Sequence, residues 1–165
     1  RARHAIKCLQ KTMVDFNELR VTPTAELAEM LDGHVADPQR AAGDIVRTLN
    51  AVFARFDTLD LSELKTRNKA DVQKMFDQVG GCPEHAKSVM LLFGFEIATM
   101  PLDERMLEHL VEAGAMPEEA DLATAKAFIE RQVKAADMGT FYWQLKKATE
   151  ADDKKRKSKG KKDTD

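Results

Sequence analysis

Residues 79–90, VGGCPEHAKSVM, lie between two amphipathic segments and predict a tight turn between two helices. Gly80 and Gly81 suit the positive φ angles that often end a helix, and Pro83 suits the first turn of the next one. Such a turn commonly serves packing alone. It can also direct consecutive backbone N–H groups outward at a helix start, where they bind a phosphate oxygen. The residues of the turn leave both interpretations open.

The segments around this turn have helical periodicity. In residues 37–56, DPQRAAGDIVRTLNAVFARF, apolar side chains recur along one face at Ile45, Leu49, Val52, Phe53 and Phe56. Similar patterns predict helices over residues 4–16, 23–31, 60–66, 68–79, 83–95, 102–112, 116–133 and 139–149. Gly and Pro are few, and β-branched residues rarely alternate with polar ones. The predicted fold class is therefore all-α, a compact multi-helix bundle with short connections.

The charge is unevenly distributed along the 165 residues. The net charge is −2, but residues 152–165 carry seven Lys or Arg and four Asp, so this end has a surplus of three positive charges. We predict one domain over residues 1–150 and a disordered basic tail over residues 151–165, which has no apolar side chain after Ala151. The tail either binds DNA loosely through counterion release or is only a solvated segment that binds no partner.

Several classes of protein are excluded by what the sequence lacks. Cys8 and Cys82 form no motif for zinc or an iron–sulfur cluster, so no metal site is predicted. No apolar run reaches the roughly 18 residues of a membrane span, and residues 1–10 do not resemble a secretory signal. We expect a cytoplasmic monomer, nucleoid-associated if bacterial, without membrane contact. The missing initiator Met suggests that some N-terminal residues of the full protein are absent.

The order of two motifs resembles one family. QVGGCPEHAKSVML, a helix, and then MPLDERML resembles the helix-hairpin-helix and Gly/Pro/Asp loop of the HhH-GPD DNA glycosylases, the endonuclease III-like proteins. An ungapped alignment places Gly80 on the first hairpin glycine, Ala86 on the motif's alanine, and residues 101–103 on the family's Pro-Val-Asp. The resemblance extends over about residues 5–143. It implies a glycosylase-like helical fold and double-stranded DNA as the partner.

The resemblance assigns the catalytic role to Asp103. In a monofunctional glycosylase, a carboxylate near the scissile N-glycosidic bond stabilises the cationic sugar and helps to orient water. A purely structural role is the alternative, because Asp103 also precedes a predicted helix, where a carboxylate is favourable.

The chain departs from the family pattern at three places. Glu84 stands where bifunctional members have a lysine, so we expect no Schiff-base lyase activity by that route. Glu84 is either a helix-start carboxylate or a second carboxylate facing Asp103, which would raise one of the two pKa values. Cys82 takes the place of the hairpin's second glycine. The four cysteines of the family's cluster loop are absent, so no iron–sulfur cofactor is expected.

The resemblance also suggests DNA contacts. The predicted hairpin contacts are Val79, Gly80, Gly81 and Cys82, and Lys87 and Arg105 are candidate phosphate contacts, although both can equally lie on solvated helix faces. His85 and His109 are predicted to be polar surface residues. The triplet FYW at residues 141–143 is either core packing or the lining of a pocket for an extruded base.

Three functions remain open from the sequence. The first is a base-excision DNA repair protein, a monofunctional N-glycosylase that uses Asp103. The second is a catalytically inactive DNA-binding module on the same scaffold, suggested by Glu84 and the altered hairpin. The third is a helical protein-interaction domain, in which case the resemblance is accidental.

Overall fold

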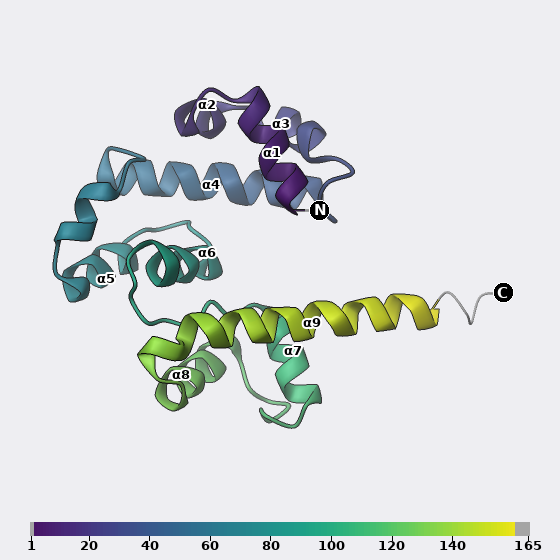
Figure 1. Cartoon of the computed structure of the whole chain (residues 1–165). Helices are drawn as coiled ribbons and strands as arrows, with labels where there is room; N and C mark the ends of the chain where they lie inside the picture. Colours follow the sequence, from purple (N-terminus) through teal and green to yellow (C-terminus); the bar gives the residue numbers. More distant parts are fainter. Residues whose placement is uncertain (1, 161–165) are drawn as a thin grey trace. The chain divides into compact units, whose positions relative to one another are not determined.

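The computed structural model describes the backbone of residues 2–160 and the side chains of residues 3–152. Every regular element over this range is a helix, and no strand occurs within it (Figure 1). The all-α prediction is therefore confirmed. No helix of this part of the chain is long and apolar enough to span a lipid bilayer.

Packing divides the chain into two compact units, Arg1–Pro83 and Glu84–Asp165. The sequence predicts one domain over residues 1–150, and the boundary between the units lies inside that range, directly before Glu84. Each unit has its own cluster of buried apolar side chains. The glycine turn therefore belongs to the first unit, and the helix that follows it belongs to the second.

Four helices build the core of the first unit: α1 (Ala2–Thr12), α2 (Phe16–Val21), α3 (Thr24–Leu31) and α4 (Pro38–Phe56). Figure 1 shows α1, α2 and α3 along one side of α4. Leu27, Leu31 and Ala42 are almost completely buried where α3 packs on α4. Helix α4 confirms the amphipathic segment predicted over residues 37–56, and Asp37 caps it by accepting the Arg40 N–H at 3.0 Å.

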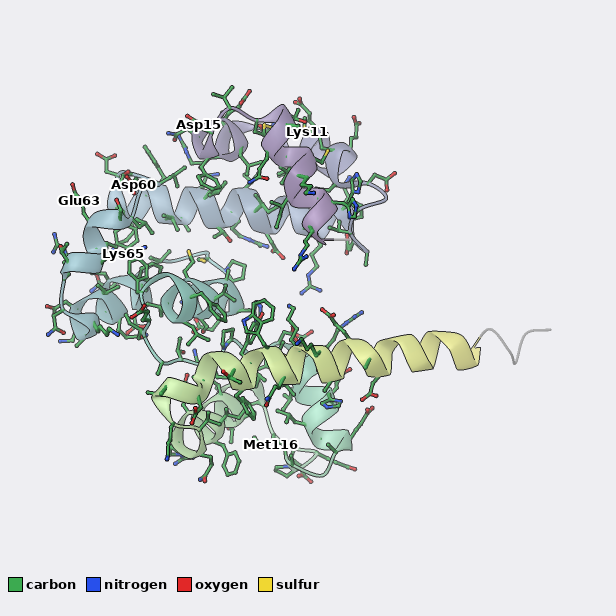
Figure 2. All side chains as sticks on the ribbon, viewed as in Figure 1. Lys11, Asp15, Asp60, Glu63, Lys65 and Met116 are labelled. Carbon is green, nitrogen blue, oxygen red and sulfur yellow. The ribbon has the colours of Figure 1, made fainter. Side chains whose placement is uncertain are left out.

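The helix predicted over residues 4–16 is present up to Thr12, but its continuation over residues 13–15 is wrong. Helix α1 ends at Thr12, and α2 starts at Phe16 because the Asp15 carboxylate accepts the Glu18 N–H at 2.8 Å (Figure 2). Asp15 has the extended backbone of an N-cap residue, with φ of −152°. This local bond outweighs the continuous periodicity and starts a new helix.

The first unit continues with η1 (Ser62–Thr66) and α5 (Lys69–Asp77). Asp60 accepts the Ser62 N–H at 3.0 Å before η1 (Figure 2). Asn68 caps α5 by accepting the Ala70 N–H at 2.8 Å, which agrees with the start of the helix predicted over residues 68–79. Val72 and Phe76 are buried on the inward face of α5.

The second unit contains α6 (Glu84–Val89), the π-helical turn η2 (Met90–Gly94), α7 (Glu104–Glu112), α8 (Leu122–Gln132), the short 3₁₀ turn η3 (Ala135–Asp137) and α9 (Met138–Gly160). Helix α7 packs against α8 and α9. The core of the second unit is rich in methionine and includes Met100, Met106, Met116 (Figure 2), Ile129 and Met138. The helix predicted over residues 116–133 begins only at Leu122, where Asp121 caps it by accepting the Thr124 N–H at 2.7 Å.

The end of the chain differs from the predicted disordered tail. Helix α9 continues through residues 151–160 and ends at Gly160. Ala, Lys, Arg and Glu have high intrinsic helix propensities, and no Gly or Pro interrupts residues 140–159, so the helix can extend without an apolar face. Residues 161–165 lie outside the part that the structure describes.

Candidate functional site

The glycine turn exposes two of the four predicted hairpin contacts. Gly80 and Gly81 are exposed, and Gly81 has a φ of +77°, which explains the need for glycine there. The Val79 and Cys82 side chains are buried, and the Cys82 Sγ lies 3.9 Å from the Thr48 Oγ1 within the first unit. Gly80 and Gly81 therefore present exposed backbone for the phosphate contact that the sequence suggests, whereas the Val79 and Cys82 side chains pack inside the unit.

The remaining candidates belong to the second unit, where Asp103 occupies a well-anchored position. Pro101 and Leu102 are buried, and the half-buried Asp103 is the N-cap of α7. Its Oδ1 accepts the Met106 N–H at 2.8 Å. The predicted helix-start role of Asp103 is thus present, and Oδ2 is the oxygen that this cap does not use.

The irregular segment before Asp103 is fixed by Glu130, a residue of α8 that the sequence does not single out. Its Oε1 accepts the hydroxyl of buried Thr99 and the Met100 N–H, both at 2.8 Å. Because these bonds involve a charged acceptor, they are stronger than ordinary amide bonds. Glu130 therefore holds the chain at the approach to Asp103.

His85 lies near Asp103, contrary to its predicted place on the solvated surface. The ring is half-buried. Burial lowers the pKa of His85 and the Lys146 ammonium adds to this effect, while the Asp103 carboxylate and the Leu102 backbone oppose it. The Nδ1 atom is buried, and no hydrogen-bond partner for it occurs among the described residues. The neutral imidazole is therefore favoured beside Asp103.

Aromatic side chains adjoin His85 on the same unit. The Tyr142 ring is 6.3 Å from the His85 ring, 5.5 Å from Phe93 and 5.2 Å from Trp143, measured between centroids. Tyr142 is buried, whereas Phe93 is 43% and Trp143 is 50% exposed. The Lys146 Nζ lies 3.4 Å from the Tyr142 hydroxyl. The FYW triplet therefore supplies both core packing, through Tyr142, and an exposed aromatic surface, through Trp143.

Glu84 binds two lysines. Its Oε2 lies 2.8 Å from the Lys87 Nζ, and its Oε1 lies 3.0 Å from the Lys126 Nζ. The pKa of Glu84 is lowered, first by the hydrogen bond from Lys87 and also by Lys126. This direction is opposite to that expected for one member of a facing carboxylate pair, and Asp103 is not among the groups that shift this pKa. Lys87, a predicted phosphate contact, is bound to Glu84, while Arg105 has an exposed side chain on α7.

His109 also has a partner. Its Nδ1 lies 2.8 Å from the Asp152 Oδ2, so this residue joins α7 to α9. Within the described residues, no group of three or more His, Cys, Asp or Glu side chains is arranged to hold a metal ion.

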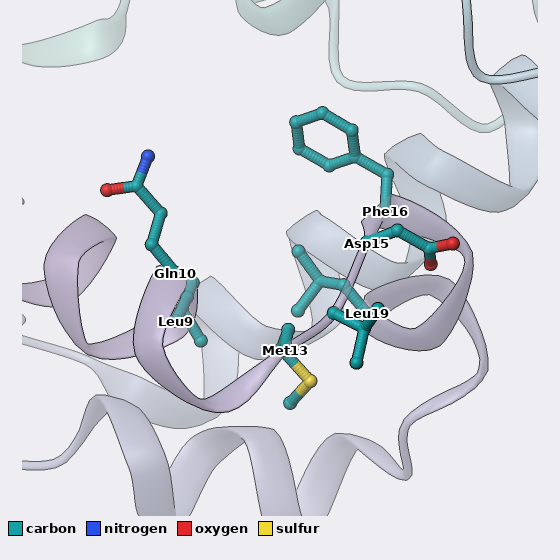
Figure 3. Close-up of a pocket in the computed structure, with 7 residues that line it drawn as sticks. Leu9, Gln10, Met13, Asp15, Phe16 and Leu19 are labelled. Atoms are coloured by element: carbon teal, nitrogen blue, oxygen red, sulfur yellow. The ribbon is translucent and has the colours of Figure 1, made fainter.

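A separate apolar pocket lies between α1 and α2 in the first unit (Figure 3). It has a volume of about 400 Å³ and is lined by Leu9, Gln10, Met13, Val14, Asp15, Phe16 and Leu19. Val14 is 90% exposed and Phe16 is 64% exposed at its edge. Its one carboxylate, Asp15, already caps α2, so the pocket lacks the converging polar groups of a catalytic site.

Sequence reasoning misses the residues that α8 and α9 bring to the surroundings of Asp103, His85 and Glu84 in the second unit. Lys126 and Glu130 come from α8 and Lys146 from α9, and no local motif marks any of them. The helical period offers a partial signal, because Lys126 and Glu130 each follow a buried core residue, Ala125 and Ile129.

Comparisons with known protein families, with curated proteins and with solved structures find no match to this chain. The structure therefore defines the class only as an all-α protein whose second unit joins Asp103, His85 and an exposed aromatic surface.

Proposed function

We propose that the chain is a base-excision DNA repair protein related to the HhH-GPD glycosylases, a monofunctional N-glycosylase that uses Asp103. The observation that carries the proposal is the order along the chain: a Gly80-Gly81 turn, helix α6, and then Pro101-Leu102-Asp103 at the start of α7. Asp103 is the residue of this motif pair with the chemistry that base excision requires.

The surroundings of Asp103 support this role. Base departure leaves positive charge on the sugar, and a carboxylate fixed in a partly desolvated place stabilises that charge without reorganising. The cap bond from Met106 fixes Oδ1, which leaves Oδ2 to face the sugar. His85, whose neutral form is favoured by burial, lies close enough to the Asp103 carboxylate for the two groups to interact electrostatically.

The aromatic surface supports recognition of an extruded base. Glycosylases must take the target nucleotide out of the duplex, and aromatic side chains stabilise unstacked bases. Phe93 and Trp143 are half-exposed, and their ring centroids lie 5.7 Å apart on the same unit as Asp103. Damaged bases with weakened pairing are the substrate class that such a surface favours, because they cost least to extrude.

The test is base release from a panel of duplexes with single damaged or mismatched bases. We expect abasic sites with at least one substrate, revealed as strand breaks after alkali treatment. Without alkali we expect intact strands and no borohydride-trapped adduct, because Glu84 replaces the imine-forming lysine. Absence of base release from the whole panel, with Asp103→Asn leaving every measured property unchanged, would exclude the enzymatic function.

A catalytically inactive DNA-binding module is the second candidate. It is favoured by the cap bond of Asp103, which gives this carboxylate a structural role without catalysis. It is also favoured by Glu84, which stands at the position of the family's lysine and pairs with Lys87 and Lys126. This candidate predicts salt-dependent duplex affinity without base release.

A protein-interaction domain is the third candidate, favoured by the exposed Val14 and Phe16 at the pocket of the first unit. Undetectable DNA binding at low salt with the complete chain would support it against the other two.

A further inference from the structure

We infer that Lys87, Lys126 and Ser88 form a phosphate-binding site that the chain's own Glu84 occupies in the absence of a ligand. For a DNA phosphate this rests on the proposed function, whereas for inorganic phosphate it does not. The three groups lie on α6 and α8 of one unit. They are separate from the glycine turn, whose possible contacts come from the backbone.

The geometry of Glu84 is that of an anion shared by two cations. Each carboxylate oxygen binds a different ammonium group, Oε2 with Lys87 at 2.8 Å and Oε1 with Lys126 at 3.0 Å. Lys126 also donates to the Ser88 Oγ at 3.0 Å. Two oxygens of a phosphate can take the places of the two carboxylate oxygens, and the Ser88 hydroxyl can donate to a third.

The exposure of the four side chains shows which of them an external anion can replace. The lysine side chains are only 16% and 24% exposed, and Ser88 is 2% exposed, whereas the Glu84 side chain is 65% exposed. The cations and the hydroxyl are therefore held by packing, and the carboxylate approaches them from the solvent side. Exchange of Glu84 for another anion keeps the two ammonium groups compensated and removes no buried group from its contacts.

The competing explanation is a purely structural bridge between α6 and α8. The two explanations differ in what removal of the Glu84 charge does. A structural bridge only weakens the fold when Glu84 is neutralised. A phosphate site with an internal occupant becomes vacant, so affinity for phosphate rises.

The first arm of the experiment measures duplex DNA affinity over a series of salt concentrations, using the full chain. Glu84→Gln is expected to bind duplex DNA about tenfold more tightly than the parent chain. The plot of log binding constant against log salt concentration should become steeper by about one unit. Lys126→Met keeps the apolar stem of the side chain but removes the ammonium group, so the gain from Glu84→Gln should disappear in the double variant. Lys87→Met is a second variant for the same purpose if Lys126→Met folds poorly.

Glu119→Gln is the matched control, because it removes the same charge from an exposed position of the second unit. It should have a smaller effect that is equal in the presence and absence of Lys126→Met. An equal gain from Glu84→Gln and Glu119→Gln, or a gain that survives Lys126→Met, would show general charge repulsion and overturn the DNA part of the proposal.

The second arm titrates inorganic phosphate into the DNA-free protein and follows the Ser88 amide signal by NMR. In the Glu84→Gln variant we expect a saturable shift, which Lys126→Met abolishes. A shift here without a DNA effect would assign the site to free phosphate and leave the glycosylase proposal to its own test. No shift in this arm, together with no Lys126-dependent gain in DNA affinity, would overturn the phosphate site altogether.

Discussion

Asp103 has an observed role as the cap of α7 and a proposed role in base release, and a single substitution can separate the two. Its Oδ1 caps α7, and loss of such a cap costs about 1 kcal/mol of folding free energy. Asparagine caps a helix about as well as aspartate. We therefore expect Asp103→Ala to lower the free energy of unfolding by about 1 kcal/mol and Asp103→Asn to leave it nearly unchanged, as measured by urea denaturation.

Asp121 provides the matched control for this prediction, since it caps α8 in the same unit by accepting the Thr124 N–H. Asp121→Ala and Asp121→Asn should show the same pattern of stability. If Asp103→Asn is as destabilising as Asp103→Ala, the carboxylate has a further structural contact and the separation of roles fails.

The lowered pKa of His85 predicts that the stability of the folded chain depends on pH. Its folded-state pKa is lowered chiefly by burial, so the unfolded chain binds more protons than the folded one as pH falls through the ordinary histidine pKa of about 6.5. Stability should therefore decrease from about pH 7 downward until the lowered folded-state pKa is reached. Thermal unfolding between pH 5 and 7.5 should show this decrease in the parent chain and a flatter profile for His85→Gln.

Glu84 acts in a different pH window. Its lowered pKa contributes stability that is present above the ordinary glutamate value and lost as pH falls through the folded-state pKa, so it does not imitate the histidine effect. An unchanged profile in His85→Gln would show that the histidine is not desolvated in the folded chain.

At the scale of elements, α8 fixes the segment that leads to Asp103. Glu130 accepts two hydrogen bonds from Thr99 and Met100, and bonds to charged groups contribute about 1.5–3 kcal/mol each. We expect Glu130→Ala to destabilise the chain by at least about 2 kcal/mol, and Glu130→Gln, which keeps an acceptor oxygen, to destabilise it less. Urea denaturation measures both, with Glu119→Gln as the exposed control. Equal stability of the Glu130→Ala variant and the parent would contradict this anchoring role.

The helices that the sequence predicts well are those with their own local signals. Helix α4 has a long apolar stripe with Asp37 and Pro38 at its start, and α5 has Asn68 as its cap. The break between α1 and α2 is missed because the Asp15 cap competes with an uninterrupted apolar pattern. The π-helical turn of η2 is missed as well, since residues 90–94 continue the apolar face of a normal helix.

The candidate site is only partly predictable, for a related reason. Asp103 follows from its motif, but the contacts that give it an environment join residues far apart in the chain. Lys126 is 42 residues from Glu84, and Glu130 is 31 residues from Thr99. Such pairs depend on how α6, α7, α8 and α9 pack together, which one sequence does not specify.

At the scale of the whole molecule, the proposed DNA binding can be tested through the charge distribution of the chain. The net charge is −2, yet residues 154–165 contain seven Lys or Arg and two Asp. A chain that ends at Asp153 keeps Asp152, the partner of His109. We expect this shorter chain to bind duplex DNA more weakly. The slope of log binding constant against log salt concentration should become shallower by about 0.9 for each phosphate contact that is lost. Identical salt slopes for the two chains would show that the basic end does not contact DNA.

The account depends most on Asp103 as the group that promotes base release. The most direct measurement is the single-turnover rate of base release from a duplex substrate, compared between Asp103→Asn and the matched cap variant Asp121→Asn. Both variants should fold with nearly the parent stability. We predict that Asp103→Asn slows release by a factor on the order of 100 or more, while Asp121→Asn retains the parent rate. A parent-like rate for Asp103→Asn would contradict the central claim.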